Sequence, residues 1–220
     1  AGSGSRSPGG DTSTVPLLGP VASLGVRAAP GEIPLPPYIT ERLADPDRYQ
    51  TVYAREPGSA AAPTAGLHFT PELFERLGER GVTVAHVELV VGLDTFRPIT
   101  DDDPTQHRMH TERYRVPAET MARCRAAERV VAVGTTSVRA LESAAGRGEL
   151  EGRTDIFIHR PFDWQVVDVL MTNFHLPKTT LLMMIDAFVG PRWRTLYDEA
   201  LRDGYRFLSF GDAMLLDRPA

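Results

Sequence analysis

The hydrophobic positions of this chain fall into short runs whose spacing distinguishes strands from helices. Runs rich in β-branched residues, or with alternating apolar and polar residues, predict strands at 82–91, 109–116, 129–133, 155–158, 166–171 and 205–210. Apolar residues three and four positions apart predict helices that begin near residues 71, 117, 138, 180 and 191. Because strands and helices alternate along the chain, we predict an α/β fold with a mixed sheet flanked by helices.

Capping residues mark the ends of several predicted helices. Thr70 and Pro71 suit the N-cap and the first position of one helix, and Gly81 follows its last turn. Either Thr179 or Thr180 is expected to cap a later helix. These residues place the loops of the predicted fold between strands and helices.

Composition is typical of a soluble globular protein. The 220 residues carry 24 Lys+Arg and 29 Asp+Glu, a formal charge of −5, and 42% of them are hydrophobic. This balance excludes global disorder. The single cysteine, Cys124, cannot form an internal disulfide, and no apolar run approaches the ~18 residues of a membrane span. We therefore expect a cytoplasmic monomer without membrane association.

The first part of the chain differs in composition from the rest. Residues 1–14 are mainly Gly, Ser, Thr and Pro, and residues 15–30 are only weakly apolar. In residues 31–39, GEIPLPPYI, three prolines fix φ and remove amide donors, which predicts an extended strap. We expect residues 1–30 to be a flexible linker and residues 31–220 to form one α/β domain.

The turn at residues 134–137 is the first candidate ligand site. Its sequence, Gly-Thr-Thr-Ser, follows a predicted strand and would present free amides and hydroxyls at the start of a helix, where a carboxylate or phosphate is stabilised. The alternative is that a threonine only caps this helix. Farther along, Arg139 and Glu142 are three residues apart, a spacing typical of an ion pair.

A second candidate site is the corner at residues 172–180. Asn173, His175 and Lys178 lie there after a predicted strand, at the position where open α/β sheets bind their ligands. Lys178 is the only lysine of the chain, which indicates that a compact ammonium is needed at this corner. The alternatives are a chance position for Lys178 and a structural role for His175.

A third candidate is the segment 63–69. Its small residues allow a ligand to approach the backbone closely. Apolar neighbours are expected to lower the pKa of His68, so that its neutral imidazole is a candidate general base. A core histidine bonded to a backbone carbonyl is the alternative.

Several common site patterns are missing from the sequence. His107, His110 and Glu112 are metal-ligand types, but on a strand positions 107 and 110 face opposite sides, so we expect no metal site. The sequence contains no Walker loop, GxGxxG, GxSxG or zinc-finger spacing. Kinases, Rossmann dehydrogenases and α/β-hydrolases are therefore disfavoured.

Eight ordered segments, which span almost all of residues 31–217, carry a resemblance to a known family. They read GEIPLPPYI (31–39), RYQTVYA (48–54), AAPTAGLHFT (61–70), HVELVVGLDTFRPI (86–99), MHTERYRV (109–116), VAVGTTSVRALES (131–143), VVDVLMTNFHLPKTTLLMMIDAFVG (166–190) and GYRFLSFGDAMLL (204–216). Together they resemble the S-adenosylmethionine:tRNA ribosyltransferase-isomerase family of queuosine biosynthesis. That family has a long N-terminal portion and an inserted β-barrel domain. The resemblance implies that this chain lacks most of the barrel and that residues 1–30 are a linker or a remnant of that region.

The resemblance implies a reaction and its substrates. The family transfers the ribosyl group of S-adenosylmethionine to 7-aminomethyl-7-deazaguanine at the wobble position of a tRNA. It then rearranges the ribosyl group to an epoxycyclopentane, giving epoxyqueuosine, and releases adenine and methionine. S-adenosylmethionine would be the co-substrate and the tRNA the partner, and no metal is implied. The proposed course begins with removal of a proton from the ribose carbon beside the sulfonium.

The resemblance also implies roles for particular residues. His68 and His175 are suited to proton transfer, one as the base and the other as the donor to departing adenine. An aromatic ring is expected to face the sulfonium, and Arg139 to hold an anion. The residues expected to bind substrate are Tyr38, Tyr49, Thr64, Gly66, Phe69, Gly134, Thr135, Thr136, Ser137, Arg139, Asn173 and Lys178.

Two alternatives to this function remain open at this point. One is a shortened relative that uses S-adenosylmethionine on a small-molecule acceptor. The other is a noncatalytic module that binds S-adenosylmethionine or tRNA. The net charge of −5 is unfavourable for binding a polyanion, although local arginine groups could still form a basic patch.

Overall fold

The computed structural model describes residues 17–20, 35–36, 38–41, 43–54, 62–91 and 103–219. The strands in these ranges are β1 (Leu17–Pro20), β2 (Val84–Val90), β3 (Glu112–Arg115), β4 (Val131–Val133), β5 (Glu151–Thr154), β6 (Val169–Asn173) and β7 (Ala213–Asp217). The α-helices are α1 (Pro71–Glu79), α2 (Ala118–Ala126), α3 (Thr135–Arg147), α4 (Thr180–Val189) and α5 (Trp193–Arg202). Short 3-10 helices include η1 (Pro46–Tyr49) and η2 (Thr64–His68).

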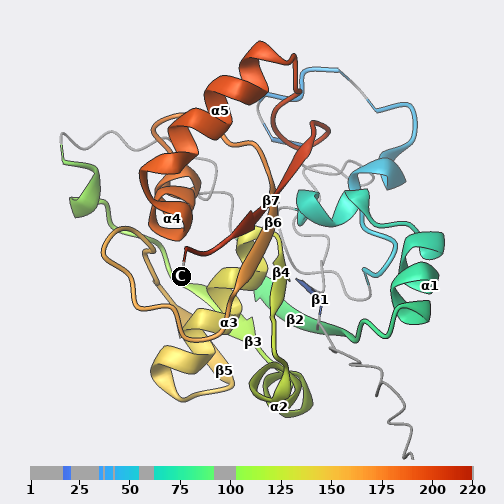
Figure 1. Ribbon diagram of the computed structural model, residues 1–220, viewed down its shortest axis with the longest axis vertical. Helices are drawn as coiled ribbons and strands as arrows, with labels where there is room; N and C mark the ends of the chain where they lie inside the picture. Colours follow the sequence, from blue (N-terminus) through green and yellow to red (C-terminus); the bar gives the residue numbers. More distant parts are fainter. Residues whose placement is uncertain are drawn as a thin grey trace, which may run out of the picture.

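The described strands form one mixed sheet in the order β5-β3-β2-β1-β4-β6-β7 (Figure 1). β1 runs parallel to β2 and β4, and β4 runs parallel to β6. β2 with β3, β3 with β5, and β6 with β7 are antiparallel pairs. The predicted mixed α/β sheet is therefore confirmed, whereas the loss of most of an inserted barrel stays a prediction.

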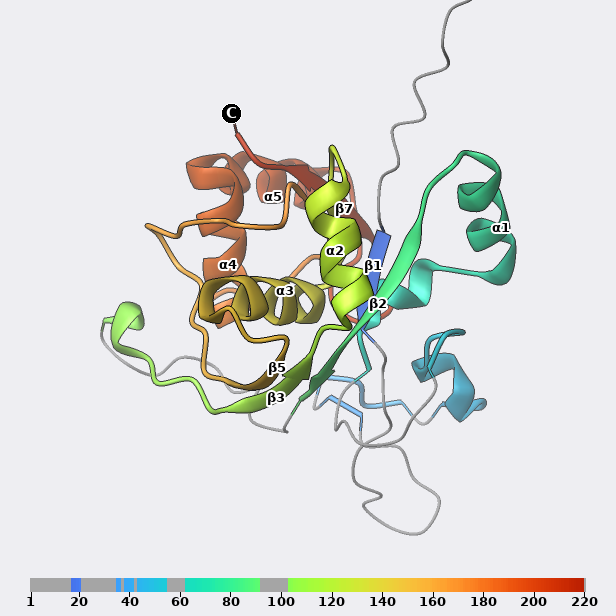
Figure 2. The same ribbon diagram turned by 90° about the horizontal axis from the view of Figure 1, so that it is seen from below.

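The two faces of the sheet are covered by different helices because successive side chains of each strand point to opposite sides. Ala132 and Leu170 face a large apolar core with side chains of α2, α3, α4 and α5. Their neighbours Val133 and Met171 face a smaller cluster with α1 and η2. Figure 2 shows this division, with α1 on one side of β2 and both α2 and α3 on the other.

Several predicted boundaries differ from those in the structure. β1 lies at residues 17–20 in the middle of the sheet, so the domain begins before residue 31 and this part of 1–30 is not a linker. The edge strand β5 occupies residues 151–154 and not 155–158, because its polar sequence, EGRT, hides it from an apolar pattern. Residues 205–210 form a loop whose Leu208 amide donates to the Phe174 carbonyl, and the last strand is β7.

The carboxylate of Glu142 joins α3 to the segment that leads into β6. Glu142 is buried, and its Oε2 accepts a hydrogen bond from the amide of Gln165 at 2.9 Å. Its Oε1 accepts from the amides of Val166 and Val167, at 3.1 and 2.9 Å. Burial raises the pKa of Glu142, an effect that these three amides partly offset. The contacts fix α3 against the sheet.

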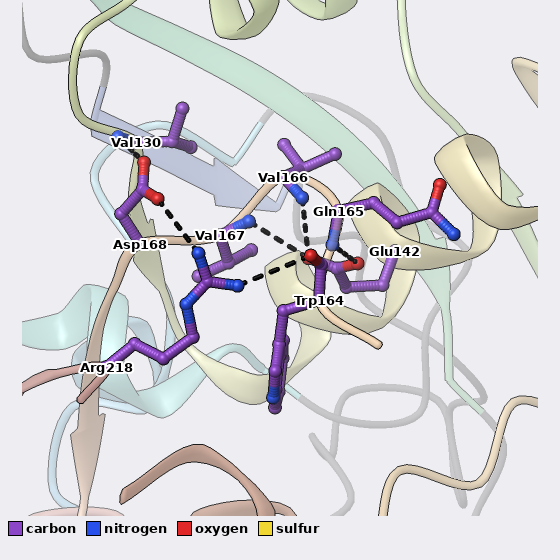
Figure 3. A network of polar contacts seen from close by, with 8 residues as sticks. All are labelled: Val130, Glu142, Trp164, Gln165, Val166, Val167, Asp168 and Arg218. Carbon is purple, nitrogen blue, oxygen red and sulfur yellow. Dashed lines mark hydrogen bonds and ion pairs between the residues drawn. The ribbon is translucent and has the colours of Figure 1, made fainter. Parts of the chain in front are cut away.

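A second carboxylate completes this network at the amino ends of β4 and β6 (Figure 3). Asp168 Oδ2 accepts from the amide of Val130 at 2.9 Å, which ties the starts of the two strands together. Arg218, just after β7, lies 3.4 Å from Asp168 Oδ1 and donates to the carbonyl of Trp164 at 3.3 Å. The network holds the strands in place at the end of the sheet opposite the candidate site.

Candidate functional site

A pocket of about 430 Å³ lies at the carboxyl ends of three strands, β2, β4 and β6. Val91 follows β2, Gly134 follows β4, and Asn173 ends β6, and all three line the pocket. Ligands of open α/β sheets bind at this end because the loops that follow the strands diverge there. The pocket is therefore the candidate functional site of the described residues.

The structure brings the three predicted sites into this one pocket. Its wall includes residues of the segment 62–65, of the turn 134–136 and of the corner 172–179. The predicted substrate-binding or catalytic residues that line it are Tyr38, Thr64, Gly134, Thr135, Thr136, Asn173 and His175. Sequence segments more than 100 residues apart thus share one cavity, while the roles of these residues stay predictions.

In the turn after β4, two backbone amides already donate hydrogen bonds within the chain. Gly134 has φ 86°, which favours glycine, and α3 begins directly at Thr135 and not at 138. The Gly134 amide donates to the Met171 carbonyl at 2.8 Å, and the Ser137 amide donates to the Gly134 carbonyl at 3.1 Å. The expectation of four free amides is therefore wrong for these two, and the amides of residues 135 and 136 remain as candidates.

Ser137 itself turns away from the pocket. It is fully buried, and its hydroxyl donates to the carbonyl of Val133 at 2.6 Å, one turn back along the chain. Ser137 does not line the pocket, so its predicted contact with a ligand stays a prediction. The hydroxyl-bearing residues of this turn that line the pocket are Thr135 and Thr136.

His175 lies in the wall of the pocket, after β6. Its Nε2 is 3.0 Å from the hydroxyl of Thr172, and its backbone amide donates to the Tyr197 hydroxyl at 3.0 Å. Burial lowers the pKa of His175 to about 4, because the charged imidazolium is poorly solvated there. His175 is therefore neutral near pH 7.

His68 does not line the pocket but contacts a residue that does. It is exposed, and its Nε2 lies 3.1 Å from Nδ2 of Asn173, which does line the pocket. Partial burial lowers the pKa of His68, and the nearby carboxylate of Asp212 opposes that shift. The alternative of a core histidine bonded to a carbonyl is wrong, because the partner is a side-chain amide.

Tyr38, from the proline-rich strap, lines the pocket beside Ser209, a residue that the sequence analysis did not predict. The Tyr38 hydroxyl is 2.9 Å from the hydroxyl of Ser209, and both residues line the pocket. Burial raises the pKa of Tyr38, and the bond to Ser209 opposes that shift. Ser209 lies in the loop that the alternating pattern assigned to a strand, and Gly204 and Gly211 on either side were the available signal of a loop.

Two predicted aromatic residues pack in the core behind the site. Tyr49 is buried against Phe210, with ring centroids 5.9 Å apart, and Phe69 is buried against Phe74, with centroids 5.4 Å apart. Neither ring lines the pocket. Tyr38 is therefore the one of the three predicted aromatic residues that the structure places in the pocket wall.

Gly66 allows the side chain of Tyr53 to pack closely against the backbone. A Cβ at this residue would overlap the hydroxyl of Tyr53, so the close approach that glycine allows is made by this side chain. Gly66 is buried and does not line the pocket. A contact between Gly66 and a ligand stays a prediction that this pocket does not support, because Tyr53 lies against the glycine.

The predicted pairing of Arg139 is also wrong. Arg139 forms a buried ion pair with Glu112 of β3, and Glu142 binds backbone amides. Arg139 does not line the pocket, and its Nε and Nη2 have no hydrogen-bond partner among the described residues. Its predicted role as an anion clamp stays a prediction that the pocket itself does not support.

Lys178 lies beside the pocket but outside its wall. It is exposed and adopts φ 58°, while its neighbours Leu176 and Thr179 line the cavity. The Thr179 side chain accepts from the amide of Leu182 and so caps α4 as predicted. A contact between Lys178 and a ligand stays a prediction.

The described residues contain no group of three or more His, Cys, Asp or Glu side chains arranged to hold a metal ion. They also contain no helix that is long and apolar enough to cross a membrane.

The fold and pocket define an α/β protein with a pocket at the carboxyl ends of parallel strands in a mixed sheet, where proteins of this class bind their ligands. Residues 20–216 match the family model described as a queuosine biosynthesis protein. The chain belongs to this family.

Curated relatives from several bacteria are similar over most of this chain. The S-adenosylmethionine:tRNA ribosyltransferase-isomerase of Acaryochloris marina is 55% identical over 194 residues, which cover 84% of this chain and 53% of that protein. The protein of the same name from Symbiobacterium thermophilum is 56% identical over 195 residues, with coverage of 84% and 57%. The chain thus spans about half the length of the curated relatives it matches.

A solved structure is also similar. The crystal structure of the S-adenosylmethionine tRNA ribosyltransferase from Thermotoga maritima matches with a TM-score of 0.57 and 45% sequence identity. The match covers 69% of this chain and 50% of that one.

Proposed function

We propose that this chain forms the S-adenosylmethionine site of a ribosyltransferase-isomerase that acts on tRNA. In this reaction the ribosyl group moves to 7-aminomethyl-7-deazaguanine in the tRNA and is isomerised, and adenine and methionine are released. The observation that carries the proposal is the single pocket in which three separate family segments meet. The names of relatives more than 50% identical support the same activity.

The pocket suits S-adenosylmethionine in size and chemistry. Its volume of about 430 Å³ lies within the ~300–1,000 Å³ of typical small-molecule sites. The amides of Thr135 and Thr136 at the start of α3 suit the methionine carboxylate, because the helix dipole favours an anion there. The ring of Tyr38 in the wall can face the sulfonium, an attraction of about 0.5–2 kcal/mol.

Two histidines are available for proton transfer in this site. His175 lines the pocket and is neutral at pH 7, so it can accept a proton or hydrogen-bond to adenine without first losing one. His68 is tied to the wall through Asn173. We assign the base and the adenine-side donor to this pair, as the resemblance implies.

An assay with defined substrates tests the proposal. The full chain is incubated with S-adenosylmethionine and tRNA that carries 7-aminomethyl-7-deazaguanine, and adenine, methionine and the modified nucleoside are followed by mass spectrometry. We expect all three products in equal amounts. Adenine release without tRNA would overturn the assignment of the acceptor. An absence of products, with S-adenosylmethionine still raising the Tm, would instead indicate a noncatalytic binding module.

Alanine variants test the roles of the two histidines in the same assay. We expect His68→Ala and His175→Ala each to lower adenine release by about 10²-fold or more, the usual contribution of a proton-transfer group. Release at the wild-type rate by either variant would contradict its role. A thermal melt of each variant separates loss of function from loss of folding.

A further inference from the structure

The side-chain amide of Asn173 is held between both ends of η2. Asn173 ends β6 and is buried. Thr64, the first residue of η2, lies with its hydroxyl 3.2 Å from Asn173 Oδ1. His68, the last residue of η2, lies with Nε2 at 3.1 Å from Asn173 Nδ2. One short turn therefore contacts both polar atoms of a single amide.

The chemistry of a third neighbour fixes which way this amide faces. Asn173 pairs with Ala213 in the sheet, and this register brings the preceding carbonyl, that of Asp212, to 3.4 Å from Asn173 Nδ2. A backbone carbonyl only accepts hydrogen bonds, so the NH₂ group must be the one that faces it. The amide oxygen then faces Thr64, whose hydroxyl donates to it.

This orientation determines the state of the histidine. The NH₂ group of Asn173 also faces His68 Nε2, and an amide NH₂ only donates. Nε2 must therefore accept, which requires it to carry no proton. In a neutral imidazole the single proton is then on Nδ1, because the bond made by one ring nitrogen sets the state of the other.

We propose that Asn173 is a positioning residue that holds neutral His68 as the Nδ1–H tautomer, with Thr64 holding the amide. A free histidine side chain in water favours the opposite tautomer, Nε2–H. In the held state neither nitrogen of His68 is free to take a proton, and Nδ1–H is a hydrogen-bond donor. Together with the proposed function, on which this step rests, the tautomer makes His68 a hydrogen-bond donor to departing adenine and leaves His175 as the base.

The charged groups near His68 are consistent with a neutral ring. The carboxylate of Asp212 raises the pKa of His68, whereas partial burial lowers it by more. Arg206 lies 3.8 Å from the same carboxylate and weakens its effect on the ring. A bond donated to the Nε2 lone pair further favours the neutral form.

Nuclear magnetic resonance tests the tautomer without any substrate. Long-range ¹H–¹⁵N spectra of the ¹⁵N-labelled full chain are recorded at pH 8, and a His68→Gln variant assigns the signals of His68 among the six histidines. We expect the Nδ1–H pattern in the wild-type protein. The Nε2–H pattern there would overturn the proposal, whatever the protein's activity.

Substitutions at both contacts of the amide separate positioning from folding. Asn173→Asp replaces a donor with an acceptor, so we expect His68 to switch to Nε2–H and its pKa to rise. Thr64→Val removes the hydroxyl that orients the amide and is expected to mix the two tautomers, whereas Thr64→Ser should keep the wild-type pattern. If an Asn173 variant fails to fold, the wild-type spectrum and the spectra of Thr64→Val and Thr64→Ser still test the tautomer. An unchanged tautomer in both folded Asn173→Asp and Thr64→Val would overturn the proposal.

The rates of adenine release test the consequence for the reaction. We expect Asn173→Ala to slow release about 10-fold or more on its own and less than about twofold in a His68→Gln background, since it acts through that histidine. Additive losses would contradict the positioning role. If the wild-type chain releases no adenine, the proposed function fails while the spectra still decide the tautomer.

Discussion

The two ends of the parallel strands carry different kinds of polar groups. At the carboxyl ends, the pocket is lined by threonine and serine residues, by Asn173 and by the neutral His175. At the amino ends, the carboxylates of Glu142 and Asp168 are held by backbone amides, with Arg218 beside Asp168 (Figure 3). A buried polar group stabilises a fold only when its bonds are made within the chain. The amino ends therefore secure the sheet, and the carboxyl ends keep capacity for a ligand.

Groups at the two ends of the strands are expected to change the free energy of unfolding in opposite directions as pH falls. At the pocket end, the lowered pKa of His175 means that the unfolded chain binds a proton more readily than the folded chain. At the other end, the raised pKa of Glu142 means that the folded chain binds a proton more readily. As pH falls from neutrality, His175 therefore lowers the free energy of unfolding and Glu142 raises it.

The largest effect is expected from Glu142→Ala. This change leaves the amides of residues 165–167 without their acceptor, and we expect it to lower the free energy of unfolding by about 3 kcal/mol. The measurement is urea denaturation at pH 7. The control is Glu119→Ala, which breaks an exposed pair with Arg123 on α2 and should cost about 0.5 kcal/mol or less. Equal losses in the two variants would contradict a structural role for the amino-end network.

His175→Gln tests the pH response of the pocket end. Between pH 6.5 and about 4 the unfolded chain takes up a proton that folded His175 does not, at a cost of up to about 3 kcal/mol in the wild-type protein. We expect the variant to lose this part of the pH dependence. Urea denaturation at several pH values measures it, and parallel curves for the two proteins would show that His175 is not held neutral.

Gly134→Ala and Gly148→Ala compare the two ends of α3. Both glycines have positive φ, but Gly134 has φ 86° and ψ 149°, a region almost restricted to glycine, whereas Gly148 has the left-handed helical values 70° and 12°. We expect losses of about 1–3 kcal/mol for Gly134→Ala and about 1 kcal/mol for Gly148→Ala. Isothermal titration should show weaker S-adenosylmethionine binding only for Gly134→Ala. Equal binding by both variants would contradict a ligand at the start of α3.

A smaller effect than that of Glu142→Ala is expected from Glu142→Gln. Glutamine keeps one acceptor oxygen but turns an NH₂ group toward one of the three amides, which should cost about 1–2 kcal/mol at pH 7. The wild-type protein gains stability as pH falls toward the raised pKa of Glu142, and the variant does not. The difference between their unfolding free energies should therefore grow on acidification. A difference that shrinks would show that folding does not raise the pKa of Glu142.

Much of the fold could be predicted where local chemistry decides it. Thr70 accepts from the amide of Leu73 at the start of α1, and Thr179 does the same for α4, as their side chains predict. The 205–210 loop could not be predicted by its pattern, because Phe207 packs in the core while Ser209 turns to the pocket, and this alternation imitates a strand. β5 was missed because its polar sequence lies at the edge of the sheet.

The candidate site divides in the same way. Its three segments could be predicted from local signals, since small residues, helix caps and histidines after apolar strands are visible in the sequence. The partners of these residues depend on the tertiary structure: Glu112 for Arg139, Tyr53 against Gly66, and Asn173 for His68. Each of these contacts joins residues from separate elements, and a local pattern does not specify sheet order. The parallel strands β4 and β6 bring them together, because their carboxyl ends meet at one edge of the sheet.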